Sequence, residues 1–221
     1  MFDAVILMAG QGLRSGLNIN KVFYKINDIP LYHYSLNAFL NAKDCRNIIL
    51  VVRPEDIKLL DHQENKRIKI VYGGLKRQDS VYNGVLSCEE QIILVHDSAR
   101  PNININLIND IYEATKKYQA AFLGAAVVDT IRECHAGFYQ KTLQRDDLWA
   151  VQTPQGFYQE TYLSCSKKAQ DESFYATDDI ELIHKYSGIK AKLVESSANN
   201  LKVTNYNDFL IVEQLMKESK S

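Results

Sequence analysis

The sequence predicts an α/β fold: a Rossmann-like open, mostly parallel twisted sheet flanked by helices, with a projecting β-arm. Over most of the 221 residues, short apolar runs alternate with segments whose apolar residues recur at helical spacing. The first run, residues 2–8 (FDAVILM), is almost continuously apolar, which is typical of a strand buried on both faces of a parallel sheet. Residues 129–147 break the alternation around Ala136-Gly137 and predict a projecting hairpin.

The other strands and helices follow from local patterns. Gly73-Gly74 ends one strand, Pro30 lies in the first turn of a helix, and the acidic residues of Thr177-Asp178-Asp179 suit the free N–H groups at a helix start. The expected helices span residues 30–42, a short segment from 54 to 56, 77–88, 104–118, 157–170, 177–186 and 206–217. The expected strands span residues 2–8, 47–53, 68–72, 92–95, 120–128, 149–154, 190–195 and 201–204.

Length and composition limit the partners. Residues 1–221 fit a single domain, and the hairpin at 129–147 would be marginal alone, so we expect it to pack on a second copy; an ordinary solvated loop is the alternative. The 26 basic and 27 acidic residues nearly balance, so we expect no nucleic-acid or membrane partner. No signal core or bilayer-length apolar run occurs, and the four cysteines form no C-x-x-C pair. These features predict a cytoplasmic protein.

A glycine-rich loop, residues 9–16 (AGQGLRSG), follows the first strand. Glycines let several backbone N–H groups point at one anion, and Arg14 and Lys21 add full charges. The loop lacks the third glycine of the dinucleotide fingerprint, where Ser15 stands, and it lacks the Gly-Lys-Ser/Thr run of the phosphate loop. This pattern favours a nucleoside triphosphate held by its charge; a surface turn is the alternative.

Three unusual segments lie at expected strand ends: the glycine loop, residues 73–80 (GGLKRQDS) and residues 96–101 (HDSARP). Because the carboxyl ends of strands in an open sheet lie along one edge, we expect one crevice there. Asp97 is well placed for a divalent metal, since Mg²⁺ typically uses one or two carboxylates plus substrate phosphates. An Asp97–Arg100 pair that closes a local turn is the alternative.

Two lysines far apart in sequence, Lys21 and Lys202, fall in loops that we place at this crevice. Two cations that face one phosphorus would stabilise the charge of a nucleotidyl-transfer transition state. A phosphate monoester is already ionised near neutral pH, so as the attacking group it needs no general base.

In order and spacing, these segments resemble the 2-C-methyl-D-erythritol 4-phosphate cytidylyltransferases of the non-mevalonate isoprenoid pathway, along essentially the whole chain. The resemblance implies transfer of CMP from CTP to the substrate phosphate, with release of pyrophosphate and with Mg²⁺ or another divalent cation. The matching stretches are Ala9-Gly10-x-Gly12-x-Arg14, Lys21, Gly73-Gly74-x-x-Arg77-x-Asp79-Ser80-Val81, His96-Asp97-x-Ala99-Arg100-Pro101, Asp129-Thr130, Gln152-Thr153-Pro154-Gln155, Thr177-Asp178 and Asn200-Leu201-Lys202-Val203-Thr204.

The resemblance also implies roles for individual residues. The catalytic cations are Arg14, Lys21 and Lys202. The sugar phosphate would meet Arg100, Thr130, Arg145, Thr153 and Thr177, with Thr130 and Arg145 offered by the second subunit of a homodimer through the arm. The nucleotide would contact Met8, Ala9, Gly10, Gly12, Gly74, Ser80 and Asp97, and Asp97 would also bind the metal.

Three positions depart from the family pattern: Ser15, Val22 and Leu75. None of them removes a charged group. The alternatives are a ribitol-5-phosphate cytidylyltransferase, which shares most of these motifs, a nucleotide-dependent oxidoreductase, which Ser15 and a missing ribose-binding acid disfavour, and a non-catalytic nucleotide sensor.

Overall fold

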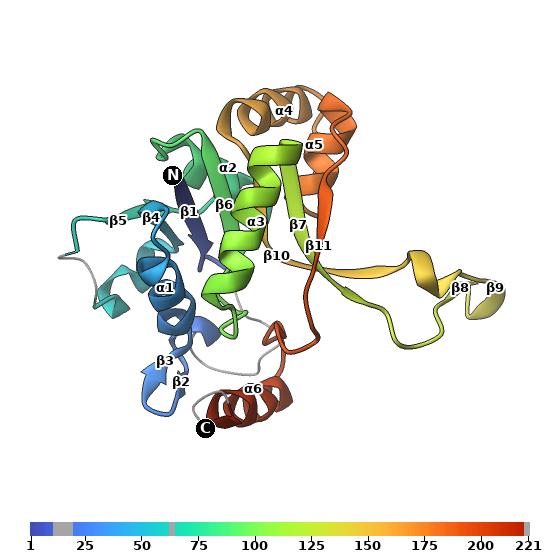
Figure 1. Cartoon of the computed structure of the whole chain (residues 1–221), viewed down its shortest axis with the longest axis horizontal. Helices are drawn as coiled ribbons and strands as arrows, with labels where there is room; N and C mark the ends of the chain where they lie inside the picture. Colours follow the sequence, from blue (N-terminus) through green and yellow to red (C-terminus); the bar gives the residue numbers. More distant parts are fainter. Residues whose placement is uncertain (11–19, 62–64, 219–221) are drawn as a thin grey trace.

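The computed structural model describes residues 1–10, 20–61 and 65–218, and within them seven strands form one main sheet (Figure 1). The strand order is β11-β7-β10-β6-β1-β4-β5, and only β10 runs antiparallel to its neighbours in this sheet. The predicted α/β class and mostly parallel sheet are therefore confirmed. The bounds are β1 Phe2–Leu7, β4 Cys45–Val52, β5 Ile68–Tyr72, β6 Ile92–Asp97, β7 Ala120–Ala126, β10 Trp149–Tyr158 and β11 Lys192–Glu195.

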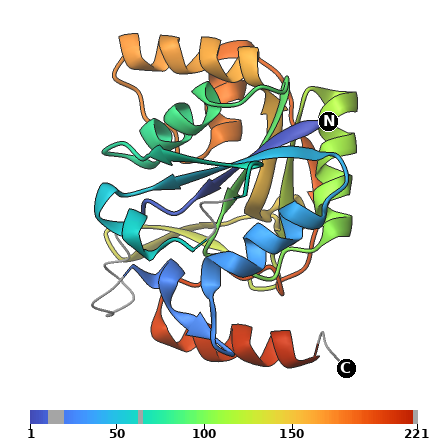
Figure 2. The ribbon, with the colours of Figure 1, turned by 90° about the vertical axis from the view of Figure 1, so that its left-hand side faces the viewer.

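Helices cover both faces of the sheet. Helices α1 and α3 pack on one face and α2, α4 and α5 on the other, as Figure 2 shows for α1 to α4. Among the described residues, none of the helices is both long enough and apolar enough to cross a membrane. The bounds are α1 Leu31–Asn41, α2 Arg77–Leu86, α3 Ile105–Tyr118, α4 Gln159–Asp171, α5 Asp179–Ser187 and α6 Tyr206–Glu218.

Strand β1 lies inside the sheet between β4 and β6, and alternate side chains enter opposite cores. Phe2, Ala4 and Ile6 pack with α1 and α3, whereas Val5 packs with α2 and α4. Buried apolar residues on both sides explain the continuous apolar run. Asp3 interrupts the run, but its carboxylate accepts bonds from the backbone N–H groups of Asn47 in β4 and of Glu89 and Glu90 in the loop after α2.

Several element boundaries differ from the expected ones. Strand β10 continues past Pro154 to Tyr158, because Phe157 and Tyr158 pair with β6, and α4 therefore begins at residue 159 instead of 157. Helix α5 begins at Asp179, two residues later than expected. Residues 201–204 form no strand; Val203 is fully buried and its N–H bonds to the Ala99 carbonyl.

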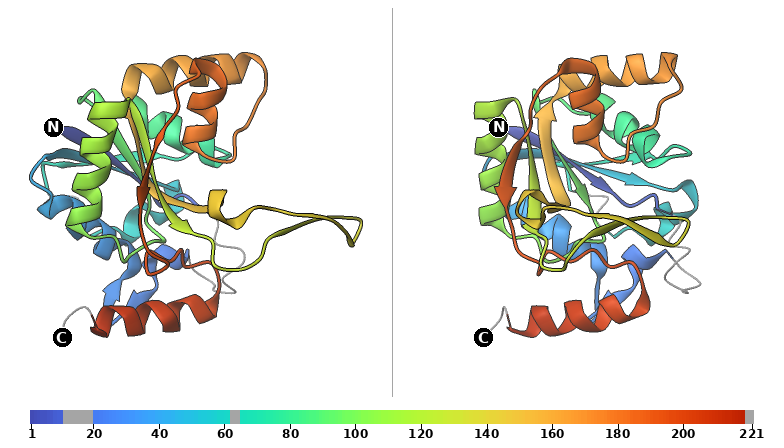
Figure 3. Two further views of the ribbon diagram at one scale, coloured as in Figure 1. Left: turned by 45° about the vertical axis from the view of Figure 1, so that its right-hand side comes forward. Right: turned by 90° about the vertical axis from the view of Figure 1, so that its right-hand side faces the viewer.

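Within the described residues, two pairs of short strands lie outside the main sheet. The sequence did not predict the two-residue strands β2 (Lys25–Ile26) and β3 (Ile29–Pro30), which pair with each other; Ile26 of β2 packs with α6 in a small separate core (Figure 3). Strands β8 (Arg132–His135) and β9 (Phe138–Thr142) pair as a hairpin within 129–147, and every residue of both is exposed. Figure 3 shows this hairpin extending away from the sheet. Its packing on a second copy stays a prediction.

A substitution at Gly156 tests how closely α3 packs on the sheet. A Cβ at this position of β10 would meet the Thr115 hydroxyl of α3 and lie 2.8 Å from Leu94 Cδ2. We expect Gly156→Ala to lower the free energy of unfolding by about 2–3 kcal/mol, because overpacking forces both elements to shift. Urea unfolding measures this change. The exposed variant Lys167→Ala should stay within about 0.5 kcal/mol of the parent, and an equally small effect of Gly156→Ala would contradict the packing described here.

Candidate active site

A cavity of about 710 Å³ opens at the carboxyl ends of β1, β5 and β6. All three segments that the sequence placed at strand ends contribute to it: residues 7–10, 73–77 with Ser80, and 97–99. Residues 20–22 and 53–55, with Lys202 and Thr204, complete the lining. Distant parts of the chain therefore meet around one hollow, as expected for an open sheet.

All of the predicted nucleotide and catalytic residues that the structure describes lie at this cavity. Gly12 and Arg14 are outside the described residues. The cavity is lined by Met8, Ala9, Gly10, Lys21, Gly74, Ser80, Asp97 and Lys202. Five predicted sugar-phosphate residues are not among its lining: Arg100, Thr130, Arg145, Thr153 and Thr177.

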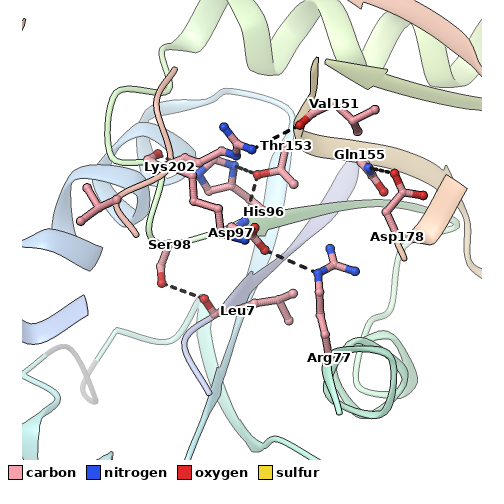
Figure 4. A network of polar contacts seen from close by, with 12 residues as sticks. Leu7, Arg77, His96, Asp97, Ser98, Val151, Thr153, Gln155, Asp178 and Lys202 are labelled. Carbon is pink, nitrogen blue, oxygen red and sulfur yellow. Dashed lines mark hydrogen bonds and ion pairs between the residues drawn. The ribbon is translucent and has the colours of Figure 1, made fainter. Parts of the chain in front are cut away.

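Asp97, at the end of β6, faces two cations (Figure 4). Lys202 Nζ lies 2.6 Å from Asp97 Oδ2, and Arg77 Nε lies 3.7 Å from Oδ1. Burial acts to raise the pKa of this carboxyl, but Arg77, Lys202 and Arg100 outweigh burial and hold the pKa of Asp97 well below its usual range. Asp97 is therefore a carboxylate whose two oxygens each face a positive group.

Arg77 is held in place by a second acid that the sequence analysis missed. Its Nη1 and Nη2 donate to Asp179 Oδ1 and Oδ2 at 3.1 and 2.8 Å, a bidentate pair that joins α2 to the start of α5. Burial acts to lower the pKa of Arg77, but Asp179 and Asp97 together raise it, so the guanidinium stays charged.

The local pattern contained a signal for this pair. Asp178 is the cap of α5, since its carboxylate accepts from Glu181 N at 2.8 Å. Because Asp178 already caps the helix, Asp179 is a second acidic residue that the cap does not require. Arg77 is a cation in the first turn of a helix, where the helix dipole disfavours positive charge. Two such residues indicate partners elsewhere in the fold.

The loop after β5 packs closely on the end of β1. A Cβ on Gly73 would lie 2.5 Å from Ala9 Cβ and 2.9 Å from Ser80 Oγ, so this approach requires glycine. Ser80 Oγ accepts from Gly74 N at 3.0 Å and donates to the Lys76 carbonyl at 3.2 Å. Backbone groups and one hydroxyl thus form a rigid wall of the cavity.

Thr153 and Arg100 lie behind Asp97 and bind other parts of the protein. Thr153 Oγ1 accepts from Asp97 N at 3.1 Å and lies 3.1 Å from His96 Nδ1 (Figure 4). Arg100 donates to the carbonyl groups of Asn200 and Val151 at 2.7 and 3.3 Å. Both side chains brace the end of β6 in this structure.

The proton on His96 can be assigned from its partners. Nε2 lies 3.1 Å from the Arg100 carbonyl, which can only accept, and 3.2 Å from Ser35 Oγ, which itself donates to that carbonyl. Nε2 therefore bears the proton, and Nδ1 accepts from the Thr153 hydroxyl. The ring is fully buried, and this burial lowers the pKa of His96 to about 4. His96 is thus a neutral link in a chain of bonds that runs from Arg100 through Thr153 to Asp97.

The other three predicted substrate residues lie away from the cavity lining. Thr130 and Arg145 belong to the segment of the hairpin, where Arg145 Nη1 donates to the Val128 carbonyl at 2.9 Å. Thr177 is exposed before α5, and its N–H donates to Glu181. Their contact with substrate stays a prediction.

The acidic side chains of the described residues are suited to a metal ion that is bound together with the phosphates of a substrate. No group of three or more His, Cys, Asp or Glu side chains that could hold a metal occurs in the described part of the chain. The ionised Asp97 at the cavity is the kind of single carboxylate that Mg²⁺ combines with substrate phosphates.

The buried neutral His96 predicts a loss of stability in acid. Below about pH 6.5 the unfolded chain binds a proton at this residue while the folded chain stays neutral to about pH 4. The free energy of unfolding should therefore fall as pH decreases through this window, by on the order of 3 kcal/mol from this residue. Urea unfolding from pH 7 to pH 4 measures it.

A matched pair of variants isolates the effect of His96. His96→Gln should flatten the dependence between pH 6.5 and 4, whereas His184→Gln, at an exposed histidine of α5, should leave it unchanged. Parallel curves for the parent and His96→Gln would refute the assignment of a neutral buried ring.

The sequence is similar to known proteins over nearly its whole length. Residues 2–218 match the model of the 2-C-methyl-D-erythritol 4-phosphate cytidylyltransferase family. The chain is 36% identical to the enzyme of that name from Bacillus thuringiensis over 226 residues, covering 100% of both chains, and 36% identical to that of Caldanaerobacter subterraneus over 225 residues, covering 98% and 99%.

Solved structures show the same fold. The crystal structure of 4-diphosphocytidyl-2C-methyl-D-erythritol synthase from Anaerococcus prevotii superimposes with a TM-score of 0.86 at 25% identity, covering 98% of this chain and 96% of that one. For the cytidylyltransferase of Thermus thermophilus the TM-score is 0.81 at 26% identity, covering 96% and 98%. The chain belongs to the 2-C-methyl-D-erythritol 4-phosphate cytidylyltransferase family.

Proposed function

We propose that this chain transfers CMP from CTP to 2-C-methyl-D-erythritol 4-phosphate, with Lys21, Lys202 and Arg14 as catalytic cations and Asp97 as the metal ligand. The reaction is inferred from the family to which the chain belongs. One observation supports the site: Lys202, Asp97 and Arg77 form a linked charge cluster at the cavity, which Ala9 and Gly10 also line. The second arm-bearing subunit, the divalent cation and the cytoplasmic location belong to the same proposal.

The chemistry requires charge neutralisation and alignment. A phosphate oxygen of the sugar phosphate attacks the α-phosphorus of CTP, the bond from that phosphorus to the β-phosphate oxygen breaks, and pyrophosphate leaves. The attacking oxygen is already ionised, so no proton has to be removed. Positively charged side chains at fixed positions lower the energy of the charge gathered on the phosphoryl group.

The two lysines lie on adjoining segments although 181 positions separate them in the sequence. Lys21 Nζ donates to the Val203 carbonyl at 2.7 Å, and Val203 directly follows Lys202. This contact supports a shared role on one phosphate chain. A divalent cation, when bound at Asp97, would supply further neutralisation of the phosphates.

The cytosine half of CTP fits the wall made by Ala9, Gly74 and Ser80. The backbone there approaches closely because Gly73 has no Cβ, and a Cβ would contact Ala9. Backbone amides and carbonyls held this rigidly can distinguish the donor and acceptor pattern of a base edge.

A direct assay tests the reaction and its substrate. Purified protein with CTP, Mg²⁺ and 2-C-methyl-D-erythritol 4-phosphate should release pyrophosphate and form the cytidine diphosphate sugar alcohol, and EDTA should stop turnover. Ribitol 5-phosphate should be a poor substrate in the same assay. Turnover of ribitol 5-phosphate alone would identify the other cytidylyltransferase.

Lys202 is the charge to remove first. Lys202→Met should lower kcat/KM by about 10²–10³-fold, which is about 3–4 kcal/mol of transition-state stabilisation. Steady-state kinetics with pyrophosphate detection measure it. Lys167→Met, at an exposed position of α4, is the control and should behave as the parent. A loss below about 3-fold for Lys202→Met would remove Lys202 from the proposed machinery.

The hairpin can be tested by oligomeric state. Phe138 and Tyr139 expose 75% and 62% of their surface, which is high for aromatic side chains. We expect Phe138→Asp to convert a dimer to a monomer in size-exclusion chromatography with light scattering, and to lower kcat/KM at least 10-fold. Leu210→Asp, on α6 at 55% exposure, should leave both unchanged. A monomeric parent chain would exclude the dimer.

A further inference from the structure

Asn20 precedes Lys21 and is 3% exposed, although asparagine is usually a surface residue. Its Nδ2 donates to the Met8 carbonyl at 2.8 Å and to Asp56 Oδ2 at 2.9 Å, and its Oδ1 accepts from Val22 N at 3.4 Å. Both amide hydrogens and the amide oxygen are therefore used. Apart from the longer glutamine, asparagine is the side chain that offers two donors and an acceptor in this way.

Each of the three bonds fixes a different part of the surroundings of Lys21. The bond to Met8 links Asn20 to the residue directly before the glycine loop, so positions 8 and 20 are joined although twelve positions separate them in the sequence. The bond from Val22 caps the short helix η2 (Lys21–Phe23) and sets the direction in which Lys21 leaves the backbone.

The third bond attaches Asn20 to a rigid support. Asp56 is 4% exposed and lies in the short helix η3 (Pro54–Leu59). Arg53 Nε and Nη2 donate to Asp56 Oδ2 and Oδ1 at 2.7 and 2.8 Å, so the carboxylate cannot turn away from Asn20 without breaking a bidentate pair. Arg53 directly follows β4, which makes the support continuous with the sheet.

The ammonium group of Lys21 contacts the segment that carries Lys202. Its Nζ is 2.7 Å from the Val203 carbonyl, next to Lys202. A lysine side chain has several rotatable bonds, so its reach is set by where its backbone is held. A shift of the backbone at residue 21 would move the charge relative to Lys202 and Asp97.

We propose that Asn20 is a positioning residue for the transfer reaction: by joining Met8 and Asp56 it holds Lys21 where its charge meets the phosphates of the nucleotide. This inference rests on the proposed function, in which Lys21 acts on those phosphates. A purely structural Asn20 would contribute stability but would not act through Lys21.

A double-mutant cycle separates the two roles. Asn20→Ala should lower kcat at least 10-fold, with the Kd for CTP changed less than about 3-fold, and Lys21→Met should lower kcat by about 10²–10³-fold. The double variant should fall no further than Lys21→Met alone, within 2-fold. Steady-state kinetics, with calorimetric binding of CTP to the full chain, measure all three variants.

Asn104→Ala is the matched control, because Asn104 caps α3 through a bond from Leu107 N at 3.0 Å. It should lose a similar amount of thermal stability and keep its kcat. If the effects of the two single variants on kcat multiply in the double variant, the inference is overturned. An Asn20→Ala enzyme with the kcat of the parent would overturn it as well. A parent chain without turnover, or a Lys21→Met variant with full kcat, would instead overturn the proposed function and this inference with it.

A second pair of variants applies if Asn20→Ala does not fold. Asn20→Asp keeps the oxygen that Val22 needs but loses both donors and puts a carboxylate beside Asp56. It should lose at least 10-fold in kcat. Adding Asp56→Asn restores a pair of one amide and one carboxylate next to Arg53. The kcat of this double variant should be at least 3-fold higher than that of Asn20→Asp. Absence of recovery would contradict the role of the Asn20–Asp56 bond.

Discussion

The buried carboxylate of Asp97 is the constraint on which the arrangement of the site depends. A charge removed from water is stable in a protein only when other charges and hydrogen-bond donors replace the lost hydration. Here Lys202 and Arg77 each face one oxygen of Asp97, and Thr153 accepts from its backbone N–H. This requirement draws α2, the segment after β11 and the part of β10 that carries Thr153 to the end of one strand.

The sheet supplies the rigidity that this cluster needs. Strand β6 pairs with β1 on one side and β10 on the other, so Asp97 ends a strand with neighbours on both edges. His96, buried beneath it, connects the backbone at Arg100 to Thr153 through a neutral ring with one defined proton position. Side chains on such a support keep their geometry better than side chains on loops, which is what a reaction that depends on charge placement requires.

The sequence predicted the features that are local and left open those set by distant contacts. Apolar periodicity located the strands of the main sheet and the site edge, although it also predicted a strand at 201–204 that does not form, and an acid just after the apolar run of β6 indicated Asp97. The length of β10 was not predictable from Pro154, because pairing of Phe157 with β6 decides it. The local pattern indicates that Asp179, next to the cap Asp178, needs a partner, but only the fold shows that this partner is Arg77. Whether Thr153 faces the cavity or the core likewise depends on His96.

The charges of the cluster also explain why it can exist before a nucleotide binds. Lys21, Lys202 and Arg77 are three cations, and without anions between them they would repel one another. Asp97 lies between Lys202 and Arg77, Asp179 neutralises the far side of Arg77, and Lys21 is held by a carbonyl dipole. The protein therefore orients Lys202 and Arg77 with its own acids and Lys21 with a backbone carbonyl. Under the proposed function, a triphosphate would meet positive groups already in place and would have little reorganisation to induce, which is the condition under which electrostatic stabilisation is most effective.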